Sequence, residues 1–386
     1  FLFYEKIKVP PPTWCPECRM MRRFTFRNEH TFTKRKCNAP GHSEDIISTY
    51  SNPKLTIYDQ KYWWSDNWDA TSYGNDLDFT KSFLHQFLEL IERTPLIALN
   101  DSKSTNANYC NMIVEHKNCY FITAGWNNDD SMYSNRIGFC KATLDSYVCH
   151  KTEFSYENIF CKESYQLFFS QYSKSCNNSY FLYDCNGCSN CIGCVGLRNK
   201  SYHIFNKPYS KEEYLKIVKE FDLGSTATLE KLREEFEKIR LNTIHKYANI
   251  LKSENVIGDN IEESKNLYWC FDVAGGAENS KYCNWVSYGM KDCYDVGPGA
   301  GAKSELIYEG ISTNTNSAQC YFDSIVWYSH NIFYSISCQS SHDLFGCVSL
   351  HNKQYCILNK QYTKEEYEEL VPKIIQHMND MPYVDK

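Results

Sequence analysis

Four residues near the start of the sequence have the types and the spacing of zinc ligands. Cys15 and Cys18 form a C-x2-C knuckle, and Cys37 and His42 follow it as a second pair. Thiolate and imidazole ligands close a tetrahedron around Zn²⁺, which stabilises a short hairpin that has little core of its own. The spacing therefore predicts a zinc ribbon in which Zn²⁺ is a structural cofactor. The second pair is not a C-x2-C knuckle, so two other residues remain alternatives for the fourth ligand: His30 and Asp45.

Basic residues are concentrated in the same segment, although the net charge of the chain is -6. Between Cys15 and Cys37 there are seven basic and two acidic residues, so this segment carries +5 and the rest of the chain -11. Phe24 and Phe26 are interleaved with the basic side chains. Basic zinc ribbons often bind phosphate backbones, which predicts contact with RNA, DNA or a ribonucleoprotein. The alternatives are a solvated surface and a contact with the acidic remainder of the chain. The predicted nucleic-acid-binding residues are Arg19, Arg22, Arg23, Arg27, Lys34, Arg35 and Lys36.

The run Cys185-x2-Cys188-x2-Cys191-x2-Cys194 resembles the ligand run of an iron–sulfur protein. In the second copy of an internal duplication, however, the two middle positions are Ser341 and Leu344. A cluster ligand cannot become leucine and keep its role, whereas a core position can. We therefore interpret the run as small apolar core residues, with a metal cluster and disulfides as alternatives.

No set of residues in the sequence has the pattern of a known catalytic site. Two aspartates on neighbouring strands could act as acid and base on a polysaccharide, but no spacing singles out a pair. The glycine-rich stretch 297–301 lacks the Lys-Ser/Thr of a phosphate loop and is interpreted as a turn. These observations favour a non-catalytic protein. The aspartates concerned are Asp184, Asp272, Asp292, Asp295, Asp323 and Asp343.

The elements that position these residues are predicted by a duplication. Residues 193–214 and 346–367 match at 15 of 22 positions with a constant offset of 153. Within each copy, aromatic and cysteine residues recur 11 positions apart, as at Tyr180, Cys191 and Tyr202. Short alternating strands at fixed spacing are typical of a solenoid, and two of them per coil predict a coil of about 22 residues.

Helices are predicted at the ends of the repeats and before them. Ser210 and Thr363 each begin a capping box, and Gly224 is the expected C-cap of the first of these helices. Further helices are predicted near 229–251 and over 80–94, the latter closed by Pro95. The tryptophan cluster at 63–68 is interpreted as an apolar cap over the following domain, with a binding platform as the alternative.

The predicted fold is mainly β, with an N-terminal zinc ribbon followed by two duplicated right-handed β-solenoid units, each capped by helices. Six segments are expected. They are a zinc ribbon at 1–60, a Trp cluster and connecting helix at 61–100, a first solenoid unit at 101–209, a helical bridge at 210–258, a second solenoid unit at 259–362 and a capping helix at 363–386.

The sequence also predicts where the protein works. Twenty cysteines in a long chain with metal-type spacing favour reduced thiols and a cytoplasmic location. No apolar run is long enough to cross a membrane, so no membrane association is expected. The chain begins at Phe1 without a methionine, and we expect it to be a fragment of a longer protein.

Several stretches resemble a family of uncharacterised proteins from candidate-phylum (reduced-genome) bacteria. They are FYEKIKVPPPTWCPECR, RKCNAPGH with IISTYS, YWWSDNWD and FGCVSLHNKQYCILNKQYTKEEYEELVPKI, together with the Cys/Tyr/Asn-rich strands between them. The resemblance covers almost the whole chain and implies a cytoplasmic, metal-bearing, repeat-built protein, but it implies no activity.

We expect a non-catalytic zinc-binding scaffold. Its ribbon would bind nucleic acid or a ribonucleoprotein, and its solenoid face a protein partner. Two alternatives from other classes remain. One is a solenoid enzyme that acts on a polysaccharide through a carboxylate pair, and the other is an iron–sulfur or metal-storage protein.

Overall fold

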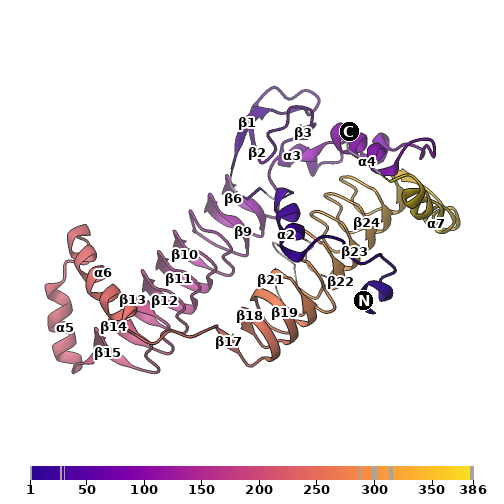
Figure 1. Cartoon of the computed structure of the whole chain (residues 1–386). Helices are drawn as coiled ribbons and strands as arrows, with labels where there is room; N and C mark the ends of the chain where they lie inside the picture. The colour runs from indigo at the N-terminus through magenta and orange to yellow at the C-terminus, as the bar shows by residue number, and fades with distance from the viewer. Residues whose placement is uncertain are drawn as a thin grey trace. The chain divides into compact units, whose positions relative to one another are not determined.

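The computed structural model describes residues 2–26, 28–29, 31–286, 288–297, 302–312 and 316–382. The chain divides into two compact units (Figure 1). Unit 1 comprises Phe1–Ala98 with Lys246–Lys386, and unit 2 comprises Leu99–His245. Both units are mainly β, and most of their strand pairs are parallel, which confirms the predicted fold class at that level. In the described part of the chain, no helix has both the length and the apolar character needed to cross a membrane.

Unit 2 contains parallel strands in which each strand pairs with the one 12 residues further along the chain. Thr105 pairs with Lys117, and Lys141 pairs with Glu153. The strands are β5 (Asp101–Ser102), β6 (Thr105–Asn108), β7 (Asn111–Val114), β8 (Lys117–Tyr120), β9 (Thr123–Trp126), β10 (Lys141–Leu144), β11 (His150–Tyr156), β12 (Lys162–Phe168), β13 (Asn177–Tyr183), β14 (Ser189–Val195), β15 (Ser201–Ile204) and β16 (Lys207–Pro208). The last two form the antiparallel pair that ends the sheet.

The predicted coil of 22 residues is wrong, because in unit 2 the chain returns to the same register after 12. Tyr180 pairs with Ile192, not with Cys191. The 11-residue spacing in the sequence instead relates diagonal neighbours on adjoining coils. The rings of Tyr109 and Tyr120, for example, lie 5.5 Å apart at their centroids. Aromatic contacts of this kind show which coils are adjacent, but their spacing does not equal the number of residues in one coil.

Within each coil of unit 2, every third residue points into the interior. Cys185, Cys188, Cys191 and Cys194 are all buried, and each follows a residue whose φ is between 49° and 66°. Four such turns close a 12-residue coil, whose narrow interior favours small side chains. The thiols bond to the backbone, as where Cys191 Sγ donates to the carbonyl of Ser189 at 3.4 Å.

The second copy of the duplication is buried at the equivalent positions, which are Cys338, Ser341, Leu344 and Cys347. This burial confirms the interpretation of the cysteine run as core.

Inward polar side chains such as Ser131 form hydrogen bonds to the backbone of their own coil and of the next one. Ser131 Oγ donates to the carbonyl of Asp129 at 2.9 Å and accepts the amide of Thr143 at 3.2 Å. His116 is also buried, and its Nε2 lies 2.6 Å from Nδ2 of Asn128. The side-chain oxygen of Asn128 accepts the amide of Cys140, so its Nδ2 is the donor and His116 Nε2 is an acceptor. The imidazole in the folded protein is therefore neutral.

This histidine makes an acid-sensitive site in unit 2. Burial lowers the pKa of His116 to about 4, whereas an unfolded histidine titrates near 6.5. Between these pH values the unfolded chain takes up the proton and the folded chain does not. The contribution of His116 to the free energy of unfolding is therefore fully present above pH 6.5 and is lost as the pH falls towards 4. We expect unit 2 to lose roughly 3 kcal/mol over this range. Amide hydrogen exchange of unit 2 peptides against pH measures the loss. His116→Gln should flatten the dependence, whereas His203→Gln, on the same unit, should keep it because His116 remains. A wild-type profile without a slope would contradict the prediction.

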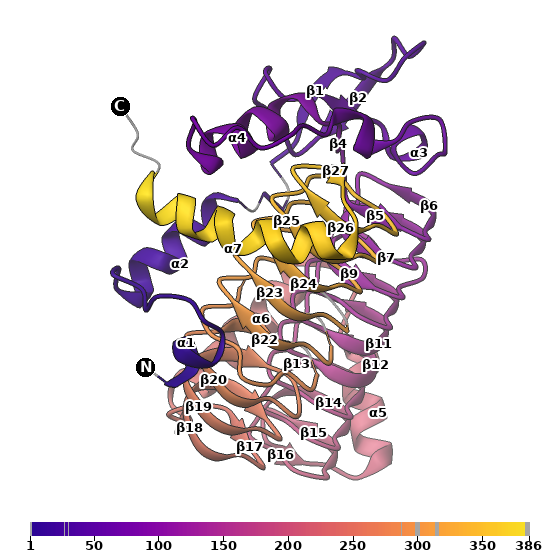
Figure 2. The ribbon, with the colours of Figure 1, turned by 90° about the vertical axis from the view of Figure 1, so that its right-hand side faces the viewer.

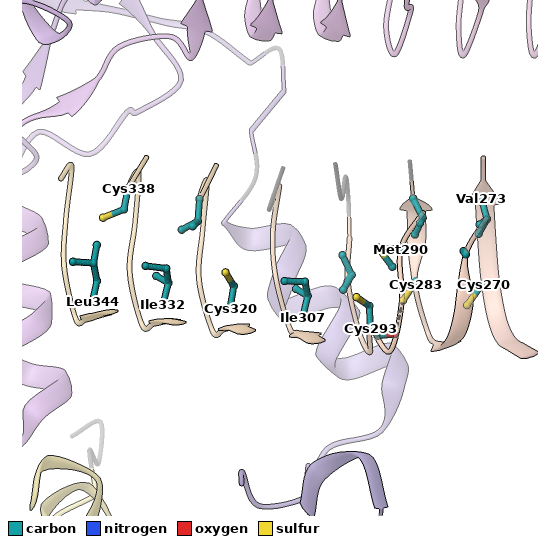
Figure 3. Close-up of a cluster of buried hydrophobic side chains, with 14 of the residues drawn as sticks. Cys270, Val273, Cys283, Met290, Cys293, Ile307, Cys320, Ile332, Cys338 and Leu344 are labelled. Atoms are coloured by element: carbon teal, nitrogen blue, oxygen red, sulfur yellow. Dashed lines mark hydrogen bonds between the residues drawn. The ribbon is translucent and has the colours of Figure 1, made fainter. Parts of the chain in front are cut away.

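Unit 1 contains a second set of parallel strands, with a less regular spacing. The offset between paired strands is 11 residues at Ile250 and Ile261, 13 at Lys265 and Glu278, and 12 at Ala318 and His330. Figure 3 shows the inward side chains of successive strands, including Cys270, Ile307 and Leu344, in one continuous core. The strands are β17 (Ile250–Leu251), β18 (Glu254–Glu262), β19 (Lys265–Val273), β20 (Glu278–Lys281), β21 (Asn284–Val286), β22 (Glu305–Tyr308), β23 (Ala318–Tyr321), β24 (His330–Phe333), β25 (His342–Phe345), β26 (Gln354–Ile357) and β27 (Lys360–Gln361).

The N-terminal segment of unit 1 begins with helices, where hairpins were expected. It contains α1 (Leu2–Lys6) and α2 (Pro16–Thr25), then an antiparallel hairpin of β1 (Thr33–Lys36) and β2 (Asp45–Ser48). Pro16 occupies the first turn of α2, where its missing N–H costs nothing. Arg19 and Arg23, one turn apart, are buried against the second set of strands. This tertiary contact favours a helix that the cysteine spacing alone did not indicate.

The rest of this segment packs on the last coils of unit 1. It comprises β3 (Ile57–Tyr58), α3 (Gln60–Trp63), η1 (Ala70–Tyr73), α4 (Phe83–Arg93) and β4 (Leu96–Ile97). The helix predicted before Pro95 is confirmed as α4, with Ser82 as its N-cap. The tryptophan cluster does pack as an apolar cap, but over the second copy of the repeat. The ring centroids of Trp63 and His351 are 4.4 Å apart.

Helices follow both copies of the duplication. They are α5 (Lys211–Glu220) and α6 (Thr226–Leu241) after the first, and α7 (Lys364–Asp380) after the second. Both predicted capping boxes are confirmed, at Ser210 and Thr363. The C-cap of α5 is Phe221 and not Gly224, and α6 ends at Leu241, ten residues earlier than the predicted 251.

Candidate metal centre

Four side chains with metal-binding atoms converge at the loop end of the β1–β2 hairpin. Cys37 follows β1 directly, His42 lies in the connecting loop, and Glu44 immediately precedes β2. Asp59 enters from a different element, because it is the N-cap between β3 and α3. One ligand atom from each of the four lies within 4.8 Å of those of the other three.

The contacts centre on the imidazole of His42. Its Nδ1 lies 2.8 Å from Oε1 of Glu44 and 3.0 Å from Oδ2 of Asp59. Cys37 Sγ lies 3.9 Å from the same Nδ1 and 3.4 Å from Asp59 Oδ2. The ring of His42 also packs edge-on against Tyr62, at 5.0 Å between centroids.

The backbone holds Cys37 in place and directs donors at its sulfur. The amides of Ala39 and Asp59 approach Sγ at 3.5 and 3.4 Å. The loop is tied to β3, because Asn38 donates its amide to the carbonyl of Ile57 and accepts the Ile57 amide on its side chain, both at 2.9 Å. Amides that point at a cysteine sulfur stabilise negative charge on it, as required for a metal-bound thiolate.

The donor set fits a divalent cation of the zinc type. A thiol, an imidazole and two carboxylates face one another around a point, and the carboxylates repel each other unless a cation lies between them. Burial raises the pKa of Cys37, so its thiolate needs a compensating positive charge. One sulfur, one nitrogen and two oxygens are all donors that divalent metal ions accept, zinc among them.

Only half of the predicted ligand set lies at this centre. Cys37 and His42 belong to it, whereas Cys15 and Cys18 lie on α2, away from the hairpin and α3 (Figure 2). Asp45, an alternative ligand, instead pairs with Lys36 at 2.8 Å and Lys34 at 2.9 Å. The other alternative, His30, lies outside the described residues.

Two members of the centre were missed in the sequence, Glu44 and Asp59. The first lies two residues from His42, and this proximity was a usable signal. The second lies 22 residues after Cys37 in the sequence. The pairing of β3 with β4 and the docking of α3 bring it to the hairpin, and neither is visible in a local pattern.

The predicted nucleic-acid-binding residues mostly have partners within unit 1. Arg19 pairs with Asp295 at 2.9 Å, Arg23 with the same carboxylate at 3.5 Å, and Arg22 with Glu309. These contacts correspond to the alternative in which the basic segment meets the acidic remainder of the chain.

The other basic residues lie around the hairpin. Arg35 donates to the carbonyl of Leu55 at 2.7 Å. Lys34 and Lys36 share Asp45 and remain exposed, and the hydrogen bond from Lys36 leads in lowering the pKa of Asp45 to about 2. Arg27 lies outside the described residues. Binding to nucleic acid stays a prediction, which now depends on these exposed lysines.

The scattered aspartates also have structural partners. Asp184 pairs with Arg198 at 2.9 Å and Asp292 with Lys6 at 2.7 Å. Asp272 accepts a hydrogen bond from Asn260, Asp323 from Ser335 and Asp343 from Asn331. Asp295 binds the α2 arginines.

Comparison of the sequence with protein-family models finds no match, and a search of curated proteins finds no relative.

Proposed function

We propose that this protein is a zinc-stabilised repeat scaffold without catalytic activity, in which Cys37, His42, Glu44 and Asp59 hold one structural Zn²⁺. The observation that carries the proposal is the convergence of four donor atoms within 4.8 Å from two separate elements. A cation at this point would join the β1–β2 hairpin to α3. It would thereby order a segment that has only a small core, made of Cys37, Ala39, Tyr58, Trp63 and Ile97.

The scaffold part of the proposal is supported by the coils, which are of the β-solenoid type. Regular coils of this kind give rigid faces suited to binding. On unit 2 these faces expose aromatic side chains, among them Tyr133 at 54% and Phe154 at 46%. The core cysteines are free thiols in this arrangement, which is consistent with the reducing cytoplasm that the proposal assumes. The identity of a protein partner stays a prediction.

The metal content of purified variants tests the ligand set. We expect wild-type protein to contain one zinc per chain by plasma mass spectrometry, and Cys37→Ala or Asp59→Ala to lose it. Cys15→Ala should keep the metal, because Cys15 lies outside the centre. Cys188→Ser is the matched control, since the second copy of the duplication carries serine at the equivalent position. Loss of zinc in Cys15→Ala with retention in Asp59→Ala would restore the ligand set predicted from the sequence, and absence of metal from wild type would end the proposal.

A further inference from the structure

Two cysteines of this chain differ from all the others in accessibility. Eighteen of the 20 cysteines are buried, whereas Cys15 is exposed and Cys18 is partly exposed. Burial raises the pKa of core thiols such as Cys293 and Cys356 to about 12, which makes them unreactive. Thiol chemistry with an external reactant is therefore directed to the Cys15–Cys18 pair.

The pair lies on the first turn of α2, with the two sulfurs on the same side. Cys15 is the N-cap of the helix, and its Sγ accepts the amide of Cys18 at 3.4 Å. A hydrogen bond to Cys15 is the largest cause that raises the pKa of Cys18. In this bond the Cys18 thiol is the donor and the Cys15 sulfur is the acceptor. Helix N-termini favour negative charge, and residues one turn apart lie within disulfide range.

The helix is anchored to the coils on one side, and the depression around its sulfurs has a mainly apolar surface. Arg19 and Arg23 fix the inner side of α2 through their buried ion pairs with Asp295. Around the sulfurs, a shallow depression is lined by Trp14, Met21, Arg22 and Thr25. Such a surface can receive an apolar side chain beside a substrate disulfide. Among the described residues, no third histidine, cysteine or carboxylate gathers with the pair to complete a metal site.

We propose that Cys15 and Cys18 form a redox-active dithiol that reduces an external disulfide. The Cys15 thiolate attacks one sulfur of the substrate, which forms a mixed disulfide and expels the other sulfur as a thiolate that takes up a proton. Cys18 then loses its proton and attacks Cys15 Sγ, which releases the second substrate thiol. The balance is one dithiol and one disulfide giving one protein disulfide and two thiols, with two electrons passed to the substrate.

The test exposes the full-length reduced protein to oxidised glutathione and, separately, to a denatured protein that contains one disulfide. We expect wild type to lose two hydrogen atoms in the peptide that contains Cys15 and Cys18, as located by mass spectrometry. Cys18→Ser should instead accumulate a stable adduct on Cys15, because the resolving thiol is missing. Cys188→Ser should react as wild type does. Reaction with only one of the two disulfides assigns the substrate to small molecules or to proteins.

Other outcomes would overturn the proposal. Stable adducts on both cysteines of wild type, without an internal disulfide, would mean two independent surface thiols. Zinc that is lost in both Cys15→Ser and Cys18→Ser would mean a metal half-site shared with another molecule. Alkylation of Cys15 by iodoacetamide less than about tenfold faster than that of the core cysteines would contradict its selective reactivity. None of these readouts depends on zinc at Cys37, so the two proposals can fail separately.

Discussion

Asp295→Ala is expected to destabilise unit 1 by about 3–5 kcal/mol and to release α2 from the coils. The carboxylate of Asp295 is fully buried and is the partner of both Arg19 and Arg23, whose side chains are 4% and 3% exposed. Its removal takes from two buried arginines the carboxylate that they share. Glu309, the other carboxylate near Arg23, already pairs with Arg22. The cost is the desolvation of those charges, which is far larger than the net contribution of the intact ion pairs.

The neighbouring Asp292→Ala is the control for this substitution. Asp292 pairs with Lys6, whose side chain is 51% exposed, so its loss should cost no more than about 1 kcal/mol. Urea unfolding of the full-length chain measures both free energies, and amide hydrogen exchange of peptides from 16–25 reports the release of α2. Equal effects of the two substitutions would show that the buried arginines find other partners.

Removal of metal from the wild-type protein is expected to be the second large effect, and it follows from the proposed zinc centre. A ligand that binds only the folded state, and whose free concentration is 1,000 times its dissociation constant, adds about 4 kcal/mol to the free energy of unfolding. Chelation should therefore lower the unfolding temperature of unit 1 and increase amide exchange in β1, β2 and β3. Added zinc should reverse both changes.

The variants separate this effect from a general action of the chelator. Cys37→Ala should start with the low unfolding temperature and should not respond to chelation. Cys188→Ser, in the core of unit 2, should respond as wild type does. A wild-type protein whose unfolding temperature is unchanged at high chelator concentration would argue against a structural ion at His42 and its neighbours.

The sequence was most informative where local rules apply. The capping boxes at Ser210 and Thr363 and the helix before Pro95 depend on contacts within one turn, so their residues predicted them correctly. The duplication was informative for a different reason. A position that is Cys191 in one copy and Leu344 in the other can only be explained by burial, and both side chains are fully buried.

The length of the coil was not determined by the visible repeat. Aromatic residues on adjoining coils contact one another along diagonals as well as directly, so their spacing varies around the true register of 12. The buried residues recur every third position, but they include Cys, Ser, Ile and Asn. A periodicity carried by such different side chains is weak in a hydropathy pattern, although it is plain in the burial.

The sequence by itself thus determined a mainly β, duplicated chain with a cysteine-filled core and helical ends, since composition and local spacing are sufficient for these features. Only the tertiary structure decided the partners of the charged and metal-binding residues. Arg19 meets Asp295 across 276 positions, and Cys37 meets Asp59 across 22. Contacts over such separations depend on how the elements pack, because a pattern in neighbouring residues cannot specify which distant carboxylate lies opposite a given cation or thiol.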